Sequence, residues 1–215
     1  MTSCTFVILD NVSSAPVQEG RYEVRVWPRK LIPAVSSLQT EWRLVSAETR
    51  ADIYLLTPFS PHRLVKLRGG TDLEVKRQHA DHDGLQYWTV PTRLTFPLSH
   101  RALDRLAIAL AAPRGLTPDA GLSPAHLIAA LTTSNPHIKP EIIQKGRLLF
   151  QRGTCRAEIT RASWANQSRL TVALEGKDPD LVSAEVRRLK LHDLPNLSYG
   201  DVLSPTPIVL GQLRI

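Results

Sequence analysis

The stretch RYEVRVW, from Arg21 to Trp27, alternates charged and apolar residues along a predicted β-strand. Successive side chains of a strand point to opposite faces, so Arg21, Glu23 and Arg25 share one face. The other face is apolar. Charges aligned on one side of a strand are costly to enclose unless a counter-charge or a ligand neutralises them. This face therefore predicts either a solvated sheet surface or a site for a charged ligand.

The chain has the composition of a globular protein and a strong excess of basic residues. Its 215 residues, 42% of them hydrophobic, are enough for one large domain, which we expect to span residues 1–215. The formal net charge of +7 suggests an anionic partner, such as nucleic acid, a membrane surface or a phosphorylated ligand. A basic surface kept for solubility would give the same total.

The sequence shows neither a membrane span nor an export signal. It has no apolar run of about 20 residues, and its first residues lack the basic flank and cleavage pattern of a secretory signal. Two cysteines, Cys4 and Cys155, are too few for a disulfide framework. We therefore expect a cytoplasmic protein with reduced thiols and no membrane partner.

Alternating segments predict antiparallel strands in two blocks, which is typical of an α+β protein. The first block begins with TFVILD at residues 5–10 and includes a hairpin across Gly69 and Gly70. The second block covers about residues 142–176. A helical segment at about 98–135 separates the blocks, with Ser123 as a helix N-cap.

Further helices are predicted at both ends of the chain. One helix is expected around Val35 to Leu44, and another is opened by Asp178 and Pro179. The tail from Leu203 onward admits one more short strand.

The polarity of the first strand recurs in later strands of both blocks. The charged positions are Lys66, Arg68, Asp72, Glu74, Lys76, Lys145, Arg147, Arg156, Glu158 and Glu175. A sheet with one solvated face alternates in the same way. However, the excess of arginine and lysine with a few glutamates favours a surface that receives phosphates while carboxylates hold a divalent cation.

The order of these motifs resembles the CYTH superfamily, also called triphosphate tunnel metalloenzymes. Its members open with a Glu-x-Glu-x-Lys strand, continue with basic pairs, and end with a carboxylate strand that runs into a Gly-acid-Pro helix start. The late match is CRAEITRASWANQSRLTVALEGKDPDLVSAEVRRLKL followed by NLSYGDVL. The earlier matches are RYEVRVW, LVKLRGGTDLEVK and IIQKGRLLF, so the resemblance covers most of the chain in the right order.

The resemblance implies an antiparallel β-barrel closed into a tunnel with flanking helices. Inward basic residues would bind a triphosphate, a nucleotide or polyphosphate, and inward glutamates would hold magnesium or manganese. The implied phosphate ligands are Arg21, Arg25, Lys66, Arg68, Lys76, Lys145, Arg147 and Arg156. The implied metal ligands are Glu23, Glu158 and Glu175.

Two presumed metal carboxylates of the family are replaced, by Arg21 and Ala173. Arg25 stands where the family has lysine, and its planar guanidinium suits oxyanions. Phosphoryl-transfer enzymes rely on cations, although magnesium often needs only one or two carboxylates. Three alternatives stay open: a metal-dependent triphosphatase, a non-catalytic nucleotide or polyphosphate sensor, and, less expected, a nucleic-acid-binding module.

Two other features have ordinary structural interpretations beside functional ones. The segment HADHDG, from His79 to Gly84, could bind a metal, but Asp-Gly between two strands favours a hairpin turn. Trp27 could stack on a nucleobase at a tunnel mouth, although packing is the commoner role of a tryptophan.

Overall fold

The computed structural model describes residues 18–58, 62–79, 81–112 and 123–204. The elements are β1 (Gln18–Val26), α1 (Pro33–Glu41), β2 (Arg43–Leu56), β3 (Arg63–Arg68), β4 (Asp72–Gln78), β5 (Gln86–Thr95), α2 (His100–Leu110), α3 (Pro124–Ser134), β6 (Lys139–Arg152), β7 (Cys155–Trp164), β8 (Gln167–Gly176), α4 (Pro179–Arg188) and α5 (Tyr199–Leu203). Cys4, the strand predicted at residues 5–10 and the tail from residue 205 lie outside the described residues.

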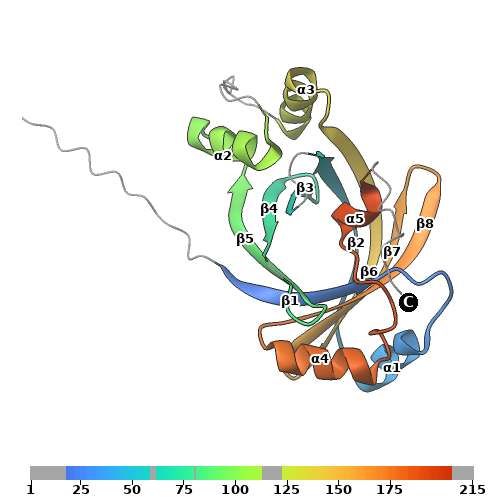
Figure 1. The fold of residues 1–215 in the computed structure, drawn as a ribbon. Helices are drawn as coiled ribbons and strands as arrows, with labels where there is room; N and C mark the ends of the chain where they lie inside the picture. The colour runs from blue at the N-terminus through green and yellow to red at the C-terminus, as the bar shows by residue number, and fades with distance from the viewer. Residues whose placement is uncertain (1–17, 59–61, 80, 113–122, 205–215) are drawn as a thin grey trace, which may run out of the picture.

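Within the described residues, eight strands form a closed antiparallel barrel in the order β1-β5-β4-β3-β2-β6-β7-β8 (Figure 1). Strand β1 closes the barrel by pairing with both β5 and β8. Closure leaves no unpaired sheet edge and separates an inner from an outer face. The predicted fold class, an α+β protein with a closed antiparallel β-barrel and flanking helices, is confirmed.

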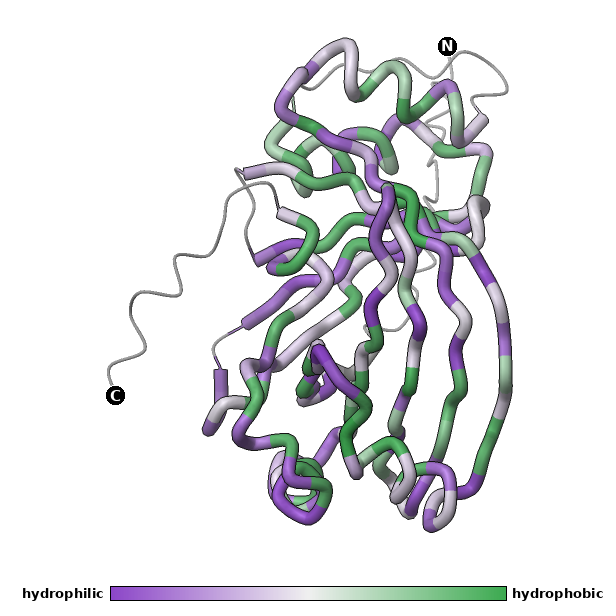
Figure 2. Tube along the Cα trace, turned by 90° about the vertical axis from the view of Figure 1, so that its right-hand side faces the viewer, coloured by the Kyte–Doolittle hydropathy of each residue, from purple (hydrophilic) through white to green (hydrophobic). Residues whose placement is uncertain are grey.

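The apolar faces of the strands point outward and are covered by helices. Helices α1 and α4 lie together on one side of the barrel, and α2 and α3 lie on the opposite side (Figure 1). Figure 2 shows the hydrophilic and hydrophobic residues alternating along the strands. Most of the apolar core is therefore outside the barrel wall, while Tyr54, Leu64 and Trp88 of a third cluster line the interior beside its charged side chains. No helix among the described residues is long and apolar enough to cross a bilayer.

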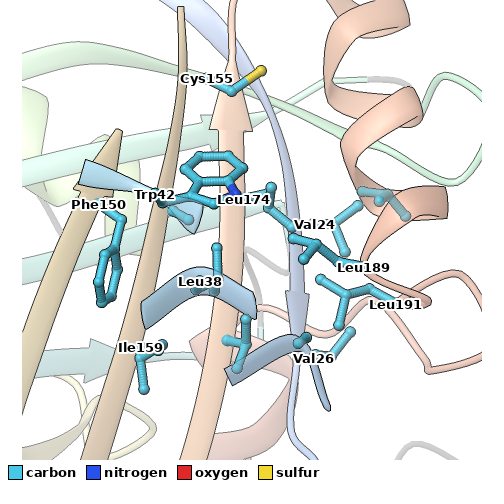
Figure 3. Close-up of a cluster of buried hydrophobic side chains, with 14 of the residues drawn as sticks. Val24, Val26, Leu38, Trp42, Phe150, Cys155, Ile159, Leu174, Leu189 and Leu191 are labelled. Atoms are coloured by element: carbon cyan, nitrogen blue, oxygen red, sulfur yellow. The ribbon is translucent and has the colours of Figure 1, made fainter. Parts of the chain in front are cut away.

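One apolar cluster joins α1 and α4 to strands β1, β6, β7 and β8. Figure 3 shows Leu38 and Trp42 among Phe150, Leu174 and Val24, which are buried side chains of three different strands. A second cluster packs α2 and α3 against β3 and β4. Both clusters hold the barrel from outside, so the inner face is free to be polar.

The first helix is shorter than predicted. Instead of running to Leu44, α1 ends at Glu41, and Trp42 has extended backbone angles (φ −108°, ψ 145°). Trp42 is 5% exposed because its ring fills the cluster under α1. Strand β2 therefore begins directly after Trp42, at Arg43.

The turn and cap signals of the sequence are found where they were predicted. Gly69 and Gly70 both have positive φ (60° and 79°) between β3 and β4, a conformation that glycine adopts without strain. Ser123 and Asp178 accept backbone N–H bonds at the starts of α3 and α4. The short helix α5 was not predicted, although Ser198 and Asp201 form a capping box before and within it.

Gly176 lies where α4 approaches the end of β8 most closely. A Cβ atom added there would lie 2.7 Å from Cγ2 of Val182, a fully buried residue of α4. A β-branched side chain has little rotamer freedom with which to avoid such a contact. The glycine of the LEGKDP motif thus permits this contact between strand and helix.

We predict that Gly176→Ala lowers the free energy of unfolding by about 1–3 kcal/mol, as overpacked cores do. The matched control is Gly146→Ala on β6, where an added Cβ has no neighbour within 4 Å. Urea unfolding of both variants checks this. Equal stabilities of the two variants would contradict the packing explanation.

Candidate ligand-binding site

The barrel interior is a cavity of about 550 Å³ lined mainly by charged side chains. Ten cationic residues line it: Arg21, Arg25, Arg50, Lys66, Arg68, Lys76, Arg93, Lys145, Arg147 and Arg156. Four carboxylates line it: Glu23, Glu74, Glu158 and Glu175. We call this cavity the bore. Its lining cations exceed its lining carboxylates by six, while the whole chain has a formal net charge of +7.

Every residue predicted to bind phosphate or metal lines the bore. The eight basic residues and the three glutamates come from six strands, and all belong to the inward-facing positions of the two-residue repeat. The structure thus brings the predicted set together. The structure shows where these side chains lie; that they bind phosphate or metal stays a prediction.

Each glutamate that lines the bore lies within 4 Å of two cationic side chains. The pairs are Arg25 and Lys76 at Glu23, Lys66 and Arg93 at Glu74, Arg25 and Arg147 at Glu158, and Arg21 and Arg156 at Glu175. The carboxylates therefore act as internal counter-ions that space the cations apart.

Arg25 connects two of these glutamates across three strands. Its Nε donates to Glu23 on its own strand β1, and its Nη1 donates to Glu158 on β7, each at 3.2 Å. Strand β8 lies between β1 and β7, and its Ala173 is the cross-strand partner of both Arg25 and Glu158. The small Ala173 side chain leaves the space through which the guanidinium reaches Glu158.

The two glutamates bound by Arg25 are held in the ionised form. Burial raises the pKa of Glu23, but Lys76 at 3.0 Å and Arg25 outweigh it and lower the pKa to about 2. Burial also raises the pKa of Glu158, but Arg25 and Arg147 together hold that pKa well below its usual range. Thr160 Oγ1 donates a further bond of 2.6 Å to Glu158.

Strand β6, next to β7, contributes a buried lysine to the bore. Lys145 Nζ donates to Asp52 Oδ2 and to Tyr54 Oη, each at 2.8 Å, and lies 3.9 Å from the centre of the Tyr199 ring. Burial, with the charge of nearby Lys66, lowers the pKa of Lys145 to about 7, although Asp52 opposes the shift. This ammonium therefore titrates near neutral pH, unlike an exposed lysine.

Two buried polar atoms of bore residues lack both a hydrogen-bond partner and an ion-pair partner among the described residues. They are Tyr199 Oη and Arg147 Nε. Burial raises the pKa of Tyr199, so its hydroxyl stays neutral and can donate. Because unpaired buried donors are costly and rare, these atoms indicate a site that a polar ligand or water completes.

Sequence reasoning missed several bore residues on β2, β5 and α5. These are Arg50, Tyr54, Trp88, Arg93 and Tyr199, together with Asp52, which pairs with the bore residue Lys145. The alternation that marks β1 also runs through residues 48–54, where it could have been recognised. No comparable pattern marks Tyr199, because it reaches the bore from the short helix α5.

The magnesium or manganese implied by the family resemblance does not fit the residues present. Glu23, Glu158 and Glu175 are each engaged by two cations, and Arg21 and Ala173 stand where further carboxylates would be. Among the described residues, no group of three or more His, Cys, Asp or Glu side chains is arranged to hold a metal ion.

The two remaining sequence features have structural roles. Trp27 Nε1 donates to the carbonyl of Leu197 at 2.9 Å, and its ring packs edge-on against Trp164 and Tyr199, which favours packing over base stacking. Asp83 and Gly84 have positive φ (49° and 80°) in the turn before β5, as a hairpin turn requires.

The fold is similar to two archaeal structures. The PH1012 protein from Pyrococcus horikoshii OT3 matches with a TM-score of 0.50 and 14% identity, over 83% of this chain and 96% of that chain. A conserved hypothetical protein from Pyrococcus furiosus matches with a TM-score of 0.50 and 13% identity, over 83% and 97%. Identities this low show a shared fold alone.

HpAC1 from Hippeastrum, a putative adenylyl cyclase with a dominant triphosphatase activity, matches with a TM-score of 0.45. The identity is 9%, over 82% of this chain and 88% of that chain. No family model and no curated protein matches the sequence.

We predict that the stability of the protein depends on pH through Lys145. Its pKa is about 7 in the folded chain and near 10.5 in the unfolded chain, so the unfolded state binds more protons between these values. Stability conferred by this group therefore rises with pH across that window, by at most about 1.4 kcal/mol per pH unit.

Urea unfolding of the wild type and of Lys145→Met at a series of pH values tests this. The wild type should gain stability relative to the variant as pH rises from about 7 to about 10. Subtracting the stability of the variant from that of the wild type at each pH removes the contribution of the other titrating groups. Parallel profiles for the two proteins would show that Lys145 titrates normally.

Proposed function

We propose that the protein is a divergent CYTH-like protein that binds a phosphate chain, inorganic or carried by a nucleotide, inside its barrel. The observation that carries this proposal is the excess of cations over carboxylates in an enclosed cavity of about 550 Å³. Phosphate oxygens would accept the charge-assisted bonds that arginine and lysine offer from several directions.

The position of the cations argues against a nucleic-acid interface. A protein that binds a nucleic-acid backbone presents its basic residues on an accessible surface, whereas the side chains of Arg25, Lys66 and Lys145 are no more than 13% exposed. A short phosphate chain can enter the bore, while a duplex would meet the outer wall.

Binding is better supported than hydrolysis. Phosphoryl-transfer enzymes use a divalent cation to bridge phosphate oxygens and neutralise the developing charge. The glutamates that could hold such a cation are already bound to arginine and lysine side chains. Fixed guanidinium groups favour holding an anion in place.

A thermal-shift panel tests the proposal with inorganic triphosphate, inorganic polyphosphate, nucleoside triphosphates and orthophosphate. Saturable stabilisation, of about 2.7 kcal/mol at a ligand concentration 100 times Kd, is expected for the triphosphate-bearing ligands. Comparing inorganic with nucleotide ligands shows whether the bound phosphate chain is inorganic or carried by a nucleotide. Phosphate release measured in the same samples would instead identify a hydrolase. The absence of stabilisation by any of these anions would refute the proposal.

We predict that Lys66→Gln weakens triphosphate binding by about tenfold or more, because Lys66 lies inside the bore and a lost charge-assisted bond costs about 1.5–3 kcal/mol. The matched control is Arg161→Gln, an exposed cation on the outer face of β7. Isothermal titration calorimetry should find the control within about twofold of wild type. Equal weakening by both variants would indicate a general effect of net charge.

A further inference from the structure

A guanidinium group lies between two carboxylates of the bore. A divalent cation shared by these carboxylates would need the same position. Glu23 on β1 and Glu158 on β7 are separated by strand β8, and Arg25 contacts both at 3.2 Å. Ala173 of β8, which is 4% exposed, faces this point without offering a ligand. The protein itself therefore supplies the positive group that both carboxylates contact.

We infer that the bore binds its phosphate chain without a divalent cation, because the Arg25 guanidinium supplies the positive charge between Glu23 and Glu158. This inference rests on the proposed function and adds the form in which the ligand is bound, as a metal-free anion. Arginine stays charged at every physiological pH, so this charge is permanent.

In the wild type, a divalent cation would have to displace Arg25 and then lie beside two further cations. Glu23 also accepts a bond from Lys76 at 3.0 Å, and Glu158 also pairs with Arg147. A cation entering between the two carboxylates would approach these ammonium and guanidinium groups at close range, and like charges repel strongly in a site screened from water. The same groups attract a phosphate chain that carries no cation.

The unpartnered donors support the same conclusion. Arg147 Nε and Tyr199 Oη are buried without a hydrogen-bond partner among the described residues. Both atoms belong to residues that line the bore. They are complementary to the oxygens of an anion and would gain nothing from a metal ion.

The decisive measurement is calorimetric titration of the wild type with inorganic triphosphate, once in EDTA and once in excess magnesium. We expect the affinity in EDTA to be within about threefold of the affinity in magnesium, or higher. Binding at least tenfold tighter with magnesium would overturn the inference and leave the proposed function standing. Binding in neither buffer would overturn the proposed function itself.

A second measurement tests the place assigned to Arg25 and needs no ligand. Arg25→Ala frees the Oε1 atoms of Glu23 and Glu158, while Lys76 and Arg147 stay on the Oε2 atoms, so manganese should bind between the freed oxygens and raise the melting temperature. The double variant Arg25→Ala/Glu158→Gln lacks one of the two carboxylates and should show no such rise, and neither should the wild type.

Each outcome of this second measurement either supports or contradicts the inference. A rise confined to Arg25→Ala supports the inference. Stabilisation of the wild type by manganese, or a folded Arg25→Ala that manganese does not stabilise, would show that Arg25 does not stand in for a cation. If Arg25→Ala does not fold, the calorimetric comparison on the wild type still decides.

Discussion

Repulsion between like charges inside a closed barrel is the constraint on which this structure depends. Seven of the eight described strands direct at least one arginine or lysine into the bore. At such distances, and with little water between them, uncompensated cations would strongly oppose folding. Four glutamates, each between two cations, make the arrangement possible. A bound anion would complete the neutralisation that these glutamates begin.

This constraint also explains why glutamates can persist in a site without serving a metal. In the fold family that the chain resembles, inward carboxylates imply a metal centre. Here the residues at two positions, Arg21 and Ala173, give the remaining carboxylates cationic side chains as partners. Arg21 adds a cation beside Glu175, and Ala173 opens the path from Arg25 to Glu158. With these replacements, Glu23, Glu158 and Glu175 serve as counter-ions of arginine and lysine.

The fold and most of the bore could be predicted from the sequence because both follow from the period of two along a strand. That period was enough to place residues such as Lys66, Lys145 and Glu158 on one face. It could not show which carboxylate meets which cation, since the contact between Arg25 and Glu158 depends on barrel closure across β8. Tyr199 escaped prediction because a five-residue helix, rather than a strand, delivers it.

The isoelectric point of about 9.8 owes much to residues that line the barrel cavity. Ten of the 27 lysines and arginines of the chain line that cavity, against four of its 20 aspartates and glutamates. An anion held inside the barrel would therefore lower the isoelectric point of the protein, and the empty and loaded forms would focus at different positions.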